Sequence, residues 1–343
     1  MNDISIRTEG VAGRITLQRP DALNAMTYDM CTAIDTAMRA WSADPAVQMV
    51  IFDALGESAF CAGGDIAELY ETGTSGDFRF GQKFWFEEYL LNALIFEFPK
   101  PVVSFLQGFT MGGGVGLGCH GTHRVVGDTS QIAMPECGIG LMPDVGGTLM
   151  LALAPGRLGE YLGTTGTRMG PADAIFAGFA DLYVPEADWT ALKADLIKGD
   201  IAALEAAARP APGGALQALQ PEIDAHFGGE TLGDIHRSLA IDDSAFATKA
   251  KKSLSRAAPL SAACTIEALH RLRGPSLTIR KALEMEYRFT ARAMQHGDFL
   301  EGIRAQIIDK DRNPKWQYAG QDVPMLAVIN MLRPLGPLGL TFD

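Results

Sequence analysis

Short runs with strand character alternate with helical patterns over the first 135 residues, and this alternation restricts the possible folds more than any other feature of the chain. The strand-like runs cover residues 4–8, 14–18, 47–53, 102–107 and 123–126. Between two of them, residues 24–41 place apolar side chains at helical spacing, and Pro45 lies beyond the end of that pattern. Strands and helices in turn indicate an α/β architecture in which helices cover a sheet.

The strand patterns stop near residue 185. From there to about residue 305, alanine-rich helical patterns dominate, with one interruption at the proline- and glycine-rich residues 209–214. Helical periodicity resumes at Ala215, which is typical of a loop between helices rather than a long linker. We therefore expect an α/β core over residues 1–185 and an all-helical region over residues 186–343.

Charge and composition exclude several classes of protein. The chain has 343 residues, 47% of them hydrophobic, which is enough to bury a sizeable core. Its net charge of −12 repels nucleic acid and anionic membranes, so any phosphate-bearing ligand needs local positive groups. A run of about 18 uncharged apolar residues is absent, and residues 1–10 lack the apolar core of a signal peptide. We expect a cytoplasmic protein that binds neither nucleic acid nor membrane.

Cysteine and histidine spacing gives no metal or nucleophile motif. Five scattered cysteines without a CxxC pair argue against a disulfide framework and a zinc site. His120 and His123 lie three apart, but nearby residues complete no convincing ligand set, so we expect a structural role and no bound metal. Cys61 has no histidine close in sequence and is interpreted as a small buried residue.

Two glycine-rich stretches follow strand-like runs. Residues 59–66 read AFCAGGDI, and paired glycines let backbone N–H groups point into a cleft. An ordinary turn capped by Asp65 explains this stretch equally well. Residues 111–118 read MGGGVGLG, although each glycine inside a helix costs about 1 kcal/mol relative to alanine. Close approach of a ligand, or tight packing of a helix on the sheet, would offset that cost. A P-loop is excluded because no Gly-Lys-Ser/Thr follows.

A third stretch, residues 133–147, carries Glu136 and Asp144 in an otherwise apolar segment rich in glycine and proline. Isolated acids among apolar residues need a reason, and a catalytic pair is one. A helix cap at Asp144 and a surface turn at Glu136 are the structural alternatives.

These three stretches, in this order, resemble the crotonase (enoyl-CoA hydratase/isomerase) superfamily. Residues 13–20 and 23–26 match its first hairpin and the loop beside CoA, and the similarity extends from about residue 10 to residue 316. Features similar to the thioester hydrolases of the superfamily are residues 87–89 with 91–92, the 134–147 segment, residues 301–304 and 308–311, Pro314 and Trp316. The resemblance implies a crotonase-like spiral of repeated ββα units, followed by a C-terminal all-helical region that covers the core or makes subunit contacts in a homo-oligomer.

The resemblance also implies where an acyl-CoA would bind. It places one oxyanion-hole N–H at Gly64 and the other at Gly113. It assigns substrate binding to Glu88, Asn24, Ala25, Ala62, Asp65 and Ile66. Arg19, Lys100 and Lys310 are candidates for holding the CoA phosphates. CoA belongs to the substrate, so we expect no separate cofactor.

The carboxylates distinguish the chemistries within the superfamily. A hydratase of this type has a second glutamate at the position of Gly116, whereas the hydrolase pattern is complete at Glu88, Gly113, Glu136 and Asp144. The resemblance therefore favours hydrolysis of a short 3-hydroxyacyl-CoA thioester, a reaction of valine catabolism. Glu136 would act as nucleophile or general base, Asp144 would bind the 3-hydroxyl or orient water, and Glu88 would line the acyl pocket. A hydratase or isomerase, and a non-catalytic acyl-CoA-binding protein, remain the alternatives.

Overall fold

The computed structural model describes residues 3–320 and 322–342 and divides into two compact units. The first unit contains Met1–Gly64, Leu90–Ala133 and Arg168–Gln217, and the second contains Asp65–Tyr89, Met134–Thr167 and Ala218–Asp343. Each unit is thus assembled from three separate stretches of chain. The boundary after residue 185 marks where strand patterns stop in the sequence, and it stays a prediction about domains. The last strand of the described chain, β9 (Leu182–Tyr183), lies just before it.

The main sheet belongs to the first unit and has the strand order β1-β2-β3-β5-β7-β9. β1 and β2 pair antiparallel, and every other neighbouring pair is parallel. Most residues of β3 and β5 are buried, as expected for parallel strands covered on both faces. The strands not yet bounded are β1 (Ile4–Glu9), β2 (Ala12–Leu17), β3 (Met49–Ala54), β5 (Val102–Phe105) and β7 (His123–Val126).

A second, smaller parallel sheet has the order β4-β6-β8. Its strands are β4 (Ala59–Cys61), β6 (Phe109–Met111) and β8 (Gln131–Ala133). Each follows a strand of the main sheet, since β4 comes after β3, β6 after β5 and β8 after β7. A helix then follows each pair, so the repeated ββα architecture expected from the sequence is confirmed.

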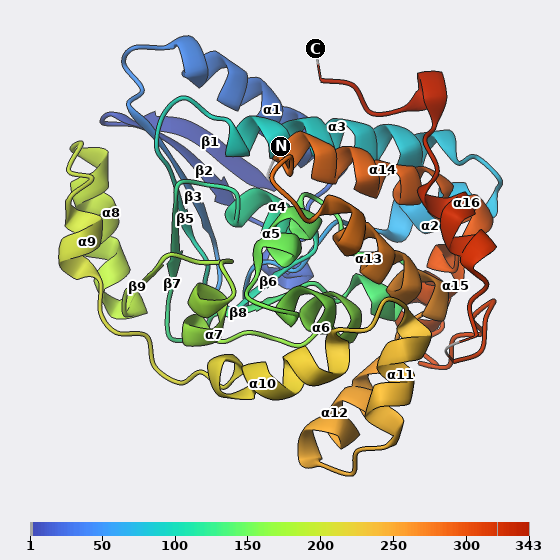
Figure 1. Ribbon diagram of the computed structural model, residues 1–343. Helices are drawn as coiled ribbons and strands as arrows, with labels where there is room; N and C mark the ends of the chain where they lie inside the picture. The colour runs from blue at the N-terminus through green and yellow to red at the C-terminus, as the bar shows by residue number, and fades with distance from the viewer. Residues whose placement is uncertain (1–2, 321, 343) are drawn as a thin grey trace. The chain divides into compact units, whose positions relative to one another are not determined.

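Helices α8 (Trp189–Ile197) and α9 (Ala203–Ala207) lie beside the main sheet within the first unit (Figure 1). Leu192, Leu196 and Leu204 pack in one buried cluster with Ile51 and Phe105 of the sheet. This cluster gives α8 a hydrophobic reason to lie against the strands.

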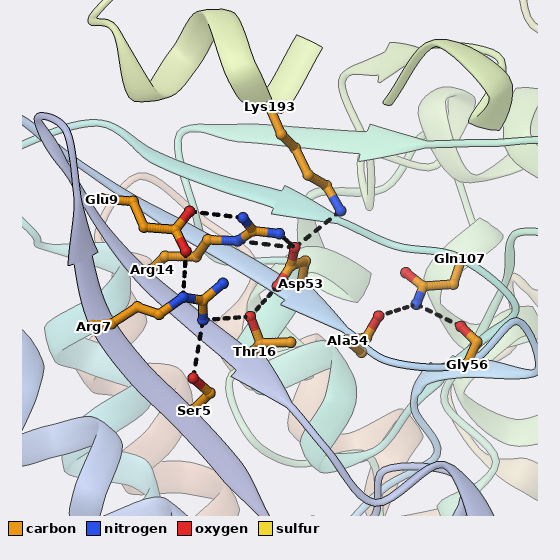
Figure 2. A network of polar contacts seen from close by, with 10 residues as sticks. All are labelled: Ser5, Arg7, Glu9, Arg14, Thr16, Asp53, Ala54, Gly56, Gln107 and Lys193. Carbon is orange, nitrogen blue, oxygen red and sulfur yellow. Dashed lines mark hydrogen bonds and ion pairs between the residues drawn. The ribbon is translucent and has the colours of Figure 1, made fainter. Parts of the chain in front are cut away.

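A buried polar network also ties α8 to the sheet, as Figure 2 shows. The Asp53 carboxylate on β3 accepts hydrogen bonds from Arg14 at 2.6 Å, from the Thr16 hydroxyl at 2.6 Å and from Lys193 of α8 at 3.0 Å. Burial by itself would raise the pKa of Asp53, but Lys193, Arg14 and Thr16 together lower it below the usual value. The network therefore holds an ionised carboxylate in a place where an unpaired one would be costly.

Helix α1 (Tyr28–Ala43) packs on the hairpin of the first unit through Trp41, whose ring leaves no room for a Cβ at Gly13. The sequence pattern placed this helix at residues 24–41. Its first residues are not helical, because Asn24 has a positive φ of 55° and the Thr27 side chain caps the helix by accepting from the Met30 N–H at 3.2 Å.

Helices dominate the second unit. The long helices α13 (Pro259–Leu272) and α14 (Ile279–His296) each bury ten residues, and α14 has one apolar face. α3 (Arg79–Phe96) and α10 (Leu216–Phe227) each have residues in both units. The other helices of the first unit are η1 (Pro20–Ala22), α4 (Gly113–Gly118), α7 (Pro171–Phe176) and η3 (Glu186–Asp188). Those of the second are α2 (Ala67–Thr74), η2 (Glu136–Ile139), α5 (Gly147–Leu153), α6 (Leu158–Thr165), α11 (Leu232–Ala240), α12 (Ala245–Leu254), α15 (Phe299–Ile303), η4 (Arg304–Ile308), α16 (Met325–Leu332) and η5 (Gly336–Leu338). The expected helical C-terminal region is confirmed.

Within the described ranges, no helix combines the length and the apolar character needed to cross a bilayer.

Candidate active site

Four acidic side chains are buried close together in the second unit. Glu88, Glu136 and Asp144 are each 4% exposed, and Glu286 is fully buried. They come from α3, from η2, from the segment before α5 and from α14. Their charges are near enough to act on one another, because Asp144 raises the pKa of Glu88, Glu136 and Glu286. Three residues proposed from the sequence thus lie together, with a fourth acid that the sequence did not reveal.

A tight backbone path brings Glu136 inward. After β8, the chain makes a single turn of 3-10 helix and ends it at Gly140, which has a φ of 76°. A Cβ at Gly140 would lie 2.4 Å from the backbone carbonyl carbon of Asp298, so only glycine allows this close approach. Glu136 is therefore an interior residue, and the alternative of a surface turn does not hold.

The turn after Asp144 is strained. Val145 has a φ of 54° and Gly146 a φ of 82°, so two consecutive residues occupy the left-handed region. For a β-branched residue such as Val145 this conformation costs about 1–3 kcal/mol and persists only where the surroundings enforce it. Strain of this kind is common at functional sites.

The Asp144 carboxylate is held by a tyrosine. The Tyr89 hydroxyl donates to Asp144 Oδ2 at 2.7 Å, and the Thr290 hydroxyl lies 3.4 Å from the same tyrosine oxygen. Helix α5 begins after Gly146 without a side-chain cap, so Asp144 does not serve as the helix cap considered from the sequence. Its contact with Tyr89 orients it instead.

Burial raises the pKa of all four acids. It raises the pKa of Asp144 to about 7, against the hydrogen bond from Tyr89, which lowers it. Burial raises the pKa of Glu286 to about 8, and it places the pKa values of Glu88 and Glu136 well above their usual range, with Asp144 adding to both shifts. Asp144 and Glu286 are therefore poised to exchange protons near neutral pH.

Glu136 differs from its neighbours in its hydrogen bonding. Both of its carboxyl oxygens are buried, and neither has a hydrogen-bond partner among the side chains and backbone groups that the structure describes. Buried polar atoms are normally paired, and leaving one unpaired costs about 1–3 kcal/mol. Asp144 holds Tyr89, and Glu286 accepts three hydrogen bonds. In contrast to Asp144 and Glu286, Glu136 is open to a further group.

The two glycines expected in the oxyanion hole lie in the first unit. Gly64 forms a parallel bridge with Met26, and this pairing uses the Met26 N–H, which donates to the Gly63 carbonyl at 2.9 Å. Gly113 is the first residue of α4, so its N–H has no partner within that helix. Both N–H groups therefore lie outside the hydrogen bonds of their own elements.

Other glycines of the second run have a packing role. A Cβ at Gly114 would lie 2.0 Å from the Cys61 carbonyl oxygen, and one at Gly118 would meet the side chains of Leu106 and Phe60. Tight packing of α4 on β4 thus explains these two positions. Gly116 is buried inside α4 and offers no carboxylate.

The loop that contains Asn24 and Ala25 is held by internal contacts. The Asn24 amide donates to the carbonyls of Leu55 and Ala59, both at 2.9 Å, and its backbone N–H donates to the Arg19 carbonyl at 2.8 Å, so this residue fixes the loop. Arg19 donates to the Ala25 carbonyl at 2.6 Å. The Ala62 N–H donates to the Leu23 carbonyl at 3.0 Å, which joins the two predicted CoA-binding segments of the first unit.

The remaining predicted contacts are scattered. Asp65 and Ile66 directly precede α2 in the second unit, where Asp65 Oδ1 accepts a long, 3.4 Å hydrogen bond from the Ala67 N–H. Lys100 donates to the carbonyls of Trp41 and of Asp44, the latter at 2.6 Å, so it caps the end of α1. Lys310 is exposed with a φ of 56°.

Sequence reasoning missed Glu286 and the role of the Tyr89 hydroxyl. A signal for Glu286 exists, because it shares the buried face of α14 with Ala282, Phe289 and Ala293, which recur at helical spacing. An acid on such an apolar face requires a buried partner.

In residues 3–320 and 322–342, no three His, Cys, Asp or Glu side chains are arranged to hold a metal ion. The five cysteines are buried and form no disulfide within the same residues.

Comparison with known proteins supports one family. The family model for enoyl-CoA hydratase/isomerase matches residues 12–330. A curated protein from Xenopus laevis, named 3-hydroxyisobutyryl-CoA hydrolase, mitochondrial, is 40% identical over 90% of this chain and 82% of its own length. The protein of the same name from Homo sapiens is 35% identical over 99% of this chain and 91% of its own length.

Solved structures agree on the fold. A crystal structure described as an enoyl-CoA hydratase from Rhodobacter sphaeroides 2.4.1 is 58% identical, covers 99% of this chain and 100% of its own, and has a TM-score of 0.95. One described as a carnitinyl-CoA dehydratase from Mycobacterium thermoresistibile is 38% identical, covers 100% of this chain and 99% of its own, and also has a TM-score of 0.95. With a family model over most of its length and these relatives, the chain belongs to the enoyl-CoA hydratase/isomerase family.

Proposed function

We propose that this chain hydrolyses the thioester of a short 3-hydroxyacyl-CoA, specifically 3-hydroxyisobutyryl-CoA to 3-hydroxyisobutyrate and CoA. Support comes from the relatives of that name at 35% and 40% identity. We assign the step to valine catabolism and to the cytoplasm, although the named relatives are mitochondrial. CoA enters as part of the substrate, and no further cofactor is proposed.

One observation carries the proposal. Glu136 is buried beside Asp144, and its two oxygens have no hydrogen-bond partner in the described chain. A substrate or water that reached this carboxyl would supply the missing partner. Burial and the charge of Asp144 also raise the pKa of Glu136 well above its usual range, a kind of shift that is common among acid and base groups of active sites.

Glu136 can act in two ways. As a nucleophile, its ionised oxygen bonds to the thioester carbonyl carbon, the C–S bond breaks, and the CoA thiolate leaves and takes up a proton; water then cleaves the mixed anhydride. As a general base, Glu136 removes a proton from water while the water oxygen attacks the same carbon; the C–S bond then breaks, and the CoA thiolate leaves and takes up the proton that Glu136 removed. In both cases we assign Asp144 to the 3-hydroxyl or to the water, and Glu88 to the acyl pocket.

The carbonyl oxygen gains negative charge in either mechanism. We assign its stabilisation to the backbone N–H groups of Gly64 and Gly113, which lie outside the hydrogen bonds of their own elements. Removing one such donor costs about 2.7–4 kcal/mol in enzymes where this has been measured.

Hydration of an enoyl-CoA is the second candidate, and it is favoured by the 58% identical structure described as a hydratase. The resemblance assigns a glutamate to position 116 in a hydratase, and this chain has glycine there. Asp144 is a second acid near Glu136, and in a hydratase it would take the place of the missing glutamate in holding water.

A substrate panel separates these functions. The purified protein is incubated with 3-hydroxyisobutyryl-CoA, 3-hydroxypropionyl-CoA and crotonyl-CoA, and both free thiol and loss of the conjugated double bond are followed. Thiol release from the 3-hydroxyacyl thioesters, lost by about 10²–10⁴-fold in Glu136→Gln, supports the proposal. Hydration of crotonyl-CoA without thiol release would replace it with the hydratase function. Binding of CoA thioesters without either reaction would indicate a non-catalytic binding protein.

A further inference from the structure

The turn at residues 144–148 is strained, although the Gly147 N–H donates to the Asp144 carbonyl within it at 2.7 Å. Val145 and Gly146 are both in the left-handed region, and the short helix α5 starts directly after them without a side-chain cap of its own. Asp144 precedes this turn, so the position of its carboxyl group depends on the turn remaining in place.

Glu286 adds three hydrogen bonds to this turn from a different helix. Its Oε2 accepts from the Gly146 N–H at 2.7 Å, and its Oε1 accepts from the Thr148 N–H at 2.9 Å and from the Thr148 hydroxyl. Glu286 lies on α14, about 140 positions further along the chain, and is fully buried. One carboxyl group thus binds the strained residue Gly146 and the first turn of α5 at Thr148.

The surroundings of Glu286 are unfavourable for a charged carboxylate. Glu286 is buried with three other acids, and burial together with Asp144 raises its pKa. The hydrogen bonds from Gly146 and Thr148 act against this rise, because they favour the ionised carboxyl group. The donors here belong to the turn that carries Asp144.

We propose that Glu286 is a positioning residue for the thioester hydrolysis proposed above: its carboxyl group holds the strained turn at Val145 and Gly146 and so fixes the place of the Asp144 carboxyl group. This inference rests on the proposed function for its catalytic consequence. The contact with the turn itself is independent of that function.

Glu286→Gln is the central variant. Its amide oxygen can still accept from Thr148, but its NH2 group then faces the Gly146 N–H, so two donors oppose each other and the turn must shift. Glu284→Gln is the matched control, since it makes the same change two residues away on α14, on a half-buried side chain outside the acid cluster.

Two readouts are expected to change together. In CoA-release kinetics with 3-hydroxyisobutyryl-CoA, Glu286→Gln lowers kcat by tenfold or more while KM stays within about threefold, because the turn positions a reacting group rather than the CoA moiety. In amide hydrogen exchange of the substrate-free protein, the Gly146 amide exchanges at least tenfold faster. Glu284→Gln leaves both at wild-type values.

The inference is overturned if kcat of Glu286→Gln stays within twofold of wild type, or if Gly146 exchange is unchanged. Should Glu286→Gln fail to fold, Thr148→Val removes a single hydroxyl donor and keeps the side-chain shape. It is expected to lower kcat and to accelerate exchange at Thr148, and wild-type behaviour of this variant would also overturn the inference. A wild type that releases no CoA refutes the proposed function, and exchange at Gly146 then decides alone whether Glu286 holds the turn.

Discussion

Removing the Tyr89 hydroxyl tests whether Asp144 must be ionised for activity. Tyr89 donates to Asp144 Oδ2 at 2.7 Å, and this hydrogen bond lowers the pKa of an acid that burial has raised to about 7. In Tyr89→Phe the ring remains and the donor is lost. Because Tyr89 is fully buried, little water is available to replace it.

The size of the effect follows from the geometry. A hydrogen bond to a charged group contributes about 1.5–3 kcal/mol, which corresponds to a rise of about one to two units in the pKa of Asp144. At pH 7 the ionised fraction then falls from about one half to between roughly 10% and 1%. If ionised Asp144 is required, kcat/KM at pH 7 drops by about five- to fifty-fold.

The assay is the pH dependence of CoA release from 3-hydroxyisobutyryl-CoA. The acid limb of kcat/KM is expected to move to higher pH in Tyr89→Phe, and the rates of variant and wild type to converge in alkaline solution. Tyr287→Phe is the control. The Tyr287 ring packs edge-on against that of Tyr89, with 6.2 Å between the ring centroids, but its hydroxyl donates to the Gln82 carbonyl. An unshifted profile, or an equal loss of rate at every pH, would refute the reasoning.

Three further predictions concern stability. Gly114→Ala places a Cβ 2.0 Å from the Cys61 carbonyl oxygen and should cost about 1–3 kcal/mol in urea unfolding, whereas Gly170→Ala, with open space around it, should not. Lys193→Met should destabilise the protein most at neutral pH. Because the pKa of Asp53 is lower in the folded than in the unfolded protein, its ionised carboxylate stabilises the fold above the pKa of the unfolded state, and this stabilisation is lost as the pH falls. The stabilities of variant and wild type should therefore converge in acid, and a constant difference between them would contradict this. The raised pKa values of Asp144 and Glu286 have the opposite sign: their contribution is lost as pH rises through about 7 to 8, and Glu136→Gln should flatten this fall in thermal unfolding. Parallel melting curves for the two proteins would contradict it.

The sequence determined the longer elements of the fold. Five strands of the main sheet were predicted close to their observed positions, and β7 matches at both ends. β3 and β5 are buried almost throughout and are rich in apolar residues, so their pattern is local and can be recognised in the sequence. The three-residue strands β4, β6 and β8 were not predicted, because strands this short are formed by pairing with one another rather than by their own residue preferences.

The start of α1 shows the same limit at closer range. Apolar periodicity began at residue 24, but Asn24 adopts a left-handed conformation to place its amide on the Leu55 and Ala59 carbonyls. Those partners are more than 30 positions away, and no local pattern encodes them.

The sequence by itself also identified Glu136 and Asp144 as candidate site residues, because they are isolated acids in an apolar segment. The resemblance to the family added Glu88. Only the tertiary structure decided their states: that Tyr89 holds Asp144, that Glu136 has no hydrogen-bond partner in the described residues, and that Glu286 closes the group from a helix about 140 positions away. The physical reason is that protonation and strain depend on burial and on neighbouring charge, and these come into being only when distant segments pack together.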